Sequence, residues 1–132
     1  MIKKYDHVGM AVSDTEGMVG LLSKLFGFKI TDQHDEPAAG FKSTTITSAD
    51  VKLELIQPTG QQSMIQKFIE KRGEGLHHVS IQVDDLDAEM KRLKELGVQF
   101  TGEKPVEMHD AYLIFVHPRS TNGLLIELKQ LK

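Results

Sequence analysis

An internal repeat constrains this chain more than any other feature of its sequence. Residues 7–14 read His-Val-Gly-Met-Ala-Val-Ser-Asp, and residues 78–85 read His-Val-Ser-Ile-Gln-Val-Asp-Asp. The match extends into the segments that follow, where Leu22 aligns with Leu93. A chain of 132 residues has the size of one compact domain, so the repeat predicts a domain built from two copies of one unit.

Each copy begins with a strand pattern and continues with a helix pattern. The apolar helix faces are Met18, Leu21, Leu22 and Leu25 in the first copy, and Leu86, Met90, Leu93 and Leu96 in the second. Ser13 with Glu16 predicts a capping box for the first helix, and Asp84 predicts the cap of the second. Gly27 and Gly97 stand where a glycine ends a helix.

Further strands complete each copy. The predicted ranges are 41–47 and 51–57 in the first copy, and 111–117 and 124–129 in the second, with a short joining helix near residues 63–71. We therefore expect an α+β fold of two tandem βαβββ modules, about residues 4–58 and 75–131, in a single domain over residues 1–132. Two curved sheets, each with a helix behind it, would form a concave sheet cavity.

The composition narrows the possible partners. The net charge is -3 and no run of Lys and Arg stands out, which argues against nucleic acid or an anionic membrane as a partner. No apolar stretch approaches the length of a membrane span, and the first residues lack a signal-peptide core, so a cytoplasmic location is expected. The absence of cysteine excludes disulfides and thiolate ligands, so any metal must be held by His, Asp or Glu.

The repeat pairs four residues that could hold a metal. His7 aligns with His78, and Glu54 aligns with Glu127 on the last strand of each copy. The His-to-Glu separations are 47 and 49 residues. Strand alternation puts both glutamates opposite the leucine-rich face, so all four residues can line the open side of the sheets. A lone His in a strand is usually structural and a lone Glu usually solvated, but agreement of both pairs favours a divalent metal site.

The remaining histidines have less support as functional residues. His77 shares the alternation of the apolar strand residues and is interpreted as structural. His34 is expected in a polar loop in contact with solvent, and His117, before a proline, is expected in a turn. His109 lies in a stretch where a loop could cover a pocket, so it is either a surface residue or a substrate contact.

Several motifs resemble one enzyme family. They are the segment Gly-Leu-His-His at 75–78 within 67–79, the segment His-Pro-Arg-Ser at 117–120 within 117–128, and the runs 6–9 and 53–58. Together they make the chain similar to methylmalonyl-CoA epimerases, members of the vicinal-oxygen-chelate superfamily that also contains glyoxalase I. The resemblance covers nearly the whole chain, and it implies a small-molecule acyl-CoA substrate and a homodimer.

The resemblance also implies a set of site residues. His7, Glu54, His78 and Glu127 match the family's metal positions, and cobalt is the expected ion, with nickel, zinc, manganese or magnesium as alternatives. Some family members carry a second acid/base glutamate where this chain has Ser43, and serine is no comparable base unaided. Glu127 is the first candidate acid/base. The candidates for the second are, in order, Glu54, His109 and Glu36.

The expected reaction is epimerisation at the carbon α to the thioester of methylmalonyl-CoA, through an enolate that the metal stabilises. A glyoxalase I-like lyase, acting on a thiol adduct with the same ligands, is the alternative enzyme. A non-catalytic binding module of the same fold is the alternative of a different class. It is disfavoured because Glu54 and Glu127 would repel each other without a cation.

Overall fold

A computed structural model describes all 132 residues and divides the chain into two compact units. The N-terminal unit is His7–His77, and the C-terminal unit is Met1–Asp6 together with His78–Lys132. Strands β1 (Ile2–Ala11) and β5 (Gly75–Val83) each contribute residues to both units. No helix is both long enough and apolar enough to span a bilayer.

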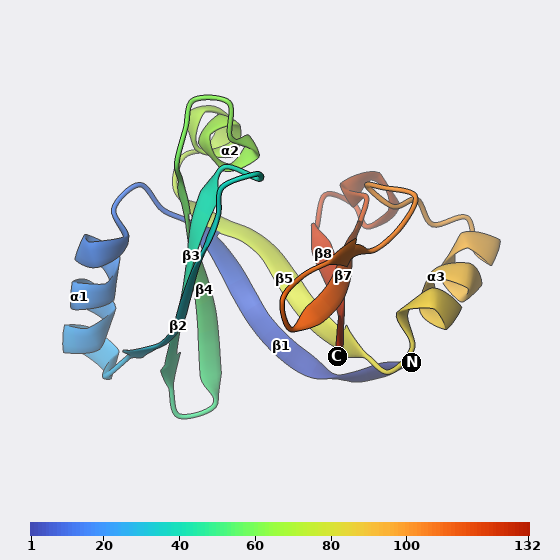
Figure 1. Cartoon of the computed structure of the whole chain (residues 1–132), viewed down its shortest axis with the longest axis horizontal. Coiled ribbons are helices and arrows are strands. Elements are labelled where there is room, and N and C mark those ends of the chain that lie inside the picture. Colours follow the sequence, from blue (N-terminus) through green and yellow to red (C-terminus); the bar gives the residue numbers. More distant parts are fainter. The chain divides into compact units, whose positions relative to one another are not determined.

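In the N-terminal unit one sheet carries two helices. After β1 the elements are α1 (Thr15–Phe26), β2 (Lys29–Glu36), β3 (Phe41–Ser48), β4 (Val51–Pro58) and α2 (Met64–Arg72). The strand order is β2-β3-β4-β1, with β1 parallel to β4 and the other pairs antiparallel. Figure 1 shows α1 beside the β2–β4 part of this sheet, in agreement with its contacts.

The C-terminal unit repeats this plan. Its elements after β5 are α3 (Leu86–Glu95), β6 (Val106–Glu107), β7 (Ala111–Val116), a 3-10 turn (Pro118–Ser120) and β8 (Ile126–Leu131). The strand order is β5-β8-β7-β6, and β5 is parallel to β8. A strand, a helix and three strands therefore occur twice, which confirms the predicted α+β fold class. The single domain over residues 1–132 stays a prediction.

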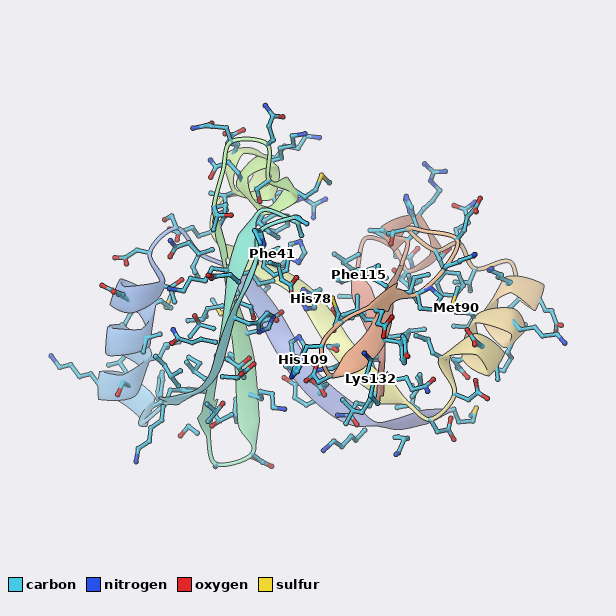
Figure 2. The ribbon with its side chains drawn as sticks, viewed as in Figure 1. Phe41, His78, Met90, His109, Phe115 and Lys132 are labelled. Atoms are coloured by element: carbon cyan, nitrogen blue, oxygen red, sulfur yellow. The ribbon has the colours of Figure 1, made fainter.

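Each unit has its own core between helix and sheet. In the N-terminal unit Val12, Phe28, Ile46 and Leu55 are buried beneath α1. In the C-terminal unit Val83, Leu86, Met90, Ile114, Val116 and Leu128 are buried together, and Figure 2 shows Met90 on α3. The predicted face of α1 is partly wrong, because Leu21 and Leu25 are exposed and the helix packs through Met18, Val19 and Leu22.

Strand β2 is the main element for which the sequence analysis predicted no residue range. Its residues 29–36 are mostly polar, and the strand lies at the edge of its sheet. The expected loop around His34 is therefore wrong, because His34 lies within β2, although its side chain is solvent-exposed as expected. The last strand also starts later than predicted, at Ile126, since residues 121–123 form a turn with Asn122 and Gly123 at positive φ.

The helix caps are shifted by one residue from those predicted. Asp14, rather than Ser13, caps α1 by accepting a hydrogen bond from the Gly17 N–H at 3.0 Å. Asp85, rather than Asp84, caps α3 in the same way. In both loops two adjacent residues have capping side chains, so residue type alone could not choose between them.

Candidate metal centre

The two faces of the N-terminal sheet differ in chemistry. Leu53 and Leu55 on β4 pack with the core beneath α1. Glu54 lies between them and has the opposite orientation, because side chains alternate along a strand. Near one end of that other face, Ile56 packs with Ile65 and other apolar residues of α2. The helix α2 thus covers part of the face and leaves the region around Glu54 to polar side chains.

His7 and Glu54 form the first imidazole–carboxylate pair. The His7 Nε2 atom lies 3.4 Å from Glu54 Oε1. The Ser43 hydroxyl, on the neighbouring strand β3, donates a hydrogen bond of 2.8 Å to Glu54 Oε2. His7 and Ser43 are buried, and the Glu54 side chain is 19% exposed. One carboxylate oxygen is therefore held by a hydroxyl while the other faces the imidazole.

His78 and Glu127 form the second pair, within the C-terminal unit. His78 Nε2 lies 4.0 Å from Glu127 Oε2, and the Ser80 hydroxyl donates a 2.7 Å hydrogen bond to Glu127 Oε1. His78, Ser80 and Glu127 are all buried. The His78 ring also meets the Phe115 ring edge to face at 5.4 Å, and Figure 2 shows both residues. The second pair thus reproduces the chemistry of the first.

The donor atoms of each pair suit a divalent ion. Imidazole nitrogen and carboxylate oxygen ligands lie about 2.1 Å from such an ion, so two ligands at a tetrahedral angle are about 3.4 Å apart. The His7–Glu54 separation has this value, and the His78–Glu127 separation corresponds to a wider angle. Both separations are short enough for one ion to contact both atoms of a pair.

A buried polar group accompanies the second pair. The Asp6 carboxylate is buried and accepts a 2.5 Å hydrogen bond from the Gln82 side chain. It also lies 3.5 Å from the Lys129 ammonium. Gln82 and Lys129 stand opposite each other on β5 and β8, two residues beyond Ser80 and Glu127. No local sequence signal pointed to Asp6, because its partners come from strands far away in the chain.

The other predicted histidines differ in their surroundings. His77 packs against the Phe68 ring at 4.8 Å, and burial lowers the pKa of its imidazole, which fits the structural role predicted for it. His117 is confirmed as a turn residue, because its Nδ1 accepts a hydrogen bond from the Arg119 N–H. His109 is exposed in the turn between β6 and β7, also visible in Figure 2, so its contact with substrate stays a prediction.

Comparison with known proteins places the chain in a family. A sequence model of the Glyoxalase/Bleomycin resistance protein/Dioxygenase superfamily matches residues 6–115. A Cereibacter sphaeroides protein named ethylmalonyl-CoA/methylmalonyl-CoA epimerase is 36% identical over 98% of this chain and 99% of its own length.

Solved structures agree with the sequence matches. Methylmalonyl-CoA epimerase from Mycobacterium tuberculosis superposes with a TM-score of 0.92 at 28% identity, over 99% of this chain and 89% of that one. A variant of the Streptomyces coelicolor epimerase, in complex with 2-nitronate-propionyl-CoA, has a TM-score of 0.92 at 25% identity over 99% of both chains. The chain therefore belongs to the Glyoxalase/Bleomycin resistance protein/Dioxygenase superfamily, as a methylmalonyl-CoA epimerase-like member.

Proposed function

We propose that this protein is a metal-dependent epimerase that inverts the carbon α to the thioester of methylmalonyl-CoA. The observation that carries the proposal is the repeated imidazole–carboxylate pair, with a serine holding each carboxylate, in a chain of this family. The relative that matches over nearly its full length is named for ethylmalonyl-CoA and methylmalonyl-CoA. Another relative, from Streptomyces coelicolor, binds an acyl-CoA compound.

The proposal assigns one divalent ion to His7, Glu54, His78 and Glu127, with cobalt as the first choice. His7, Glu54 and His78 offer the ligand atoms that suit such an ion. The equivalence of the two pairs in the repeat supports Glu127 as the fourth ligand. We also propose that residues 1–132 act as one domain, and that the protein works as a homodimer in the cytoplasm.

The chemistry needs a carbon acid and groups that move its proton. A bound divalent ion would polarise the thioester and carboxylate oxygens and so make the α-proton easier to remove. Glu127 is the proposed acid/base on one side of that carbon, because its buried carboxylate is held in a fixed orientation by Ser80. Inversion is simplest with a second acid/base group on the other side of the carbon.

The test is an assay with both methylmalonyl-CoA epimers on protein loaded with cobalt, nickel or zinc. We expect interconversion of the epimers, with solvent deuterium entering at the α-carbon in deuterated water. Conversion of methylglyoxal with a thiol, without interconversion of the epimers, would instead show a glyoxalase-like lyase. Purified protein that holds no metal and takes up none would indicate the binding module.

A further inference from the structure

Strand β2 carries three ionisable side chains on one face. Asp32, His34 and Glu36 are spaced two residues apart, so their side chains share an orientation. His34 Nδ1 lies 3.4 Å from Asp32 Oδ2, and His34 Nε2 lies 3.6 Å from Glu36 Oε1. The imidazole is therefore flanked by a carboxylate on each side.

The strand register turns this group toward the face that carries Glu54. Directly opposed residues of antiparallel strands point to the same side of a sheet. His34 is opposed to Ser43, and Asp32 is opposed to Thr45. Thr45 is opposed in turn to Glu54, which accepts the hydrogen bond from Ser43. His34 thus lies on the Glu54 face, one strand beyond Ser43.

A β-bulge produces this orientation. The register of β2 against β3 shifts between Ile30 and Asp32, which leaves Thr31 as an extra residue. Ile30 is opposed to Ile46, a core residue beneath α1. If Thr31 were paired in a regular register, alternation would keep Asp32 and His34 on the side of Ile30, facing that core. Bulges commonly re-aim side chains beside active sites, and this one turns His34 away from the core.

The His34 ring is accessible to a small molecule. Its side chain is 40% exposed, and that of Glu36 is 30% exposed. The charged residues Asp35 and Lys42 are opposed to each other in the register and alternate with His34 and Ser43, so they lie on the other face. Ser43 is fully buried and its hydroxyl donates to Glu54, so Ser43 does not offer a base on this face.

We propose that His34, flanked by Asp32 and Glu36, is the second acid/base of the epimerisation. This rests on the proposed function. In one direction the C–H bond α to the thioester breaks, its electron pair passes toward the thioester oxygen, and the proton moves to a ring nitrogen of His34. A proton from the acid/base group on the other side of the carbon then bonds to the opposite face of the same carbon. In the other direction the two groups exchange roles, and proton exchange with water resets them.

The experiment compares His34→Asn with Asp35→Asn, a matched change on the same strand but on the other face. General acid–base catalysis contributes roughly 10²–10⁴-fold, so we expect His34→Asn to lower the kcat for epimerisation at least about 100-fold. Its KM and unfolding midpoint should stay close to those of the unchanged protein. Deuterium should still enter one epimer without inversion, because the acid/base group on the other side of the carbon remains. Asp35→Asn should epimerise normally.

A second variant separates proton transfer from a structural role. Added imidazole should restore part of the activity of His34→Ala, because the exposed position can admit the free base, and it should leave Asp35→Asn unchanged. Two results would overturn the role of His34 and leave the epimerase proposal standing. One is epimerisation by His34→Asn at the original rate, and the other is loss of deuterium exchange from both epimers in that variant. Absence of both inversion and exchange in the unchanged protein would reject the epimerase proposal together with it.

Discussion

A serine hydroxyl fixes each of the two paired carboxylates. Ser43 binds one oxygen of Glu54, and Ser80 binds one oxygen of Glu127, so each carboxylate presents its other oxygen to a histidine. The two serines are not equivalent in the repeat, since Ser80 lies on the first strand of its copy and Ser43 on β3. The same contact is thus made from two different strands, and in both units it fixes the orientation of the carboxylate.

We therefore expect Ser80→Ala to weaken cobalt binding about tenfold, because residues that orient metal ligands typically contribute 10- to 100-fold in affinity. Competition with a chromophoric chelator measures this affinity without reference to activity. Ser80→Thr should restore most of the binding. Ser48→Ala is the control, because Ser48 bonds the Phe26 carbonyl away from Glu54. Unchanged affinity in Ser80→Ala would show that the serine does not position the ligand.

The strands that carry the glutamates also bind the helices of their units. The Thr15 N–H at the start of α1 donates to the Gln57 side chain at 2.9 Å, and the Leu86 N–H at the start of α3 donates to Gln130 at 2.7 Å. Each glutamine lies three residues after the glutamate of its strand. The duplicated unit thus keeps a helix-to-strand contact that supplements the aspartate caps.

Loss of this contact should destabilise the helix–strand junction. We expect Gln130→Ala to lower the free energy of unfolding by about 1–2 kcal/mol, the usual range for a lost partner of a helix N-terminal N–H group. Urea unfolding followed by circular dichroism measures the change. Gln61→Ala in an exposed turn serves as the control and should unfold like the unchanged protein. Equal midpoints for the two variants would contradict this role of Gln130.

A buried carboxylate on helix α3 should make the stability of the protein depend on pH. The Arg92 guanidinium, 2.5 Å from the Glu89 carboxylate, lowers the pKa of that buried group, and the amino terminus 3.1 Å away adds to the effect. A lowered folded pKa gives stability that is present above the unfolded value, about 4.5, and is lost as the pH falls through the folded value.

We expect Glu89→Gln to lower the melting temperature at pH 7 by about 3 °C and to reduce the further loss between pH 5 and 3. Calorimetry across that range measures both effects. Glu95→Gln, an exposed change on the same helix, should keep the pH profile of the unchanged protein. An identical acid profile for Glu89→Gln would show that other carboxylates govern the acid response.

The sequence predicted the elements in which the repeat and the alternation agree. They include β1, β5, the two helices that follow them, and the opposite orientation of Glu54 and Leu55. Strand β2 was not predicted because Thr31 interrupts its alternation and its residues are mostly polar. The hydroxyl contacts of Ser43 and Ser80 could not be predicted, since they depend on which strands become neighbours rather than on local pattern.

At the scale of the whole molecule, the duplication gives each unit one complete imidazole–carboxylate pair. Two arrangements are then chemically distinct. Either each pair binds its own ion with two protein ligands, or both pairs share one ion with four. Structural and catalytic sites of this chemistry use three or four protein ligands, so two ligands alone would bind weakly. The shared ion is therefore the proposed arrangement. It can be tested, because it differs from separate ions in the number of ions bound and in the effect of a change in one unit.

A shared ion requires that damage to either unit abolish the whole site. We expect one cobalt per chain in the unchanged protein, and binding weakened at least about 100-fold in His7→Ala and in His78→Ala alike. A ligand present at 100 times its Kd stabilises the folded state by about 2.7 kcal/mol, and a site weakened 100-fold keeps only about 0.4 kcal/mol of this, so most of the rise in melting temperature on adding cobalt should be lost in both variants. Metal analysis and calorimetry measure these quantities, with His117→Ala as the control because that imidazole belongs to a turn. Independent pairs would give two ions per chain, and each single variant would keep one of them, because the unaltered unit retains its own histidine and glutamate.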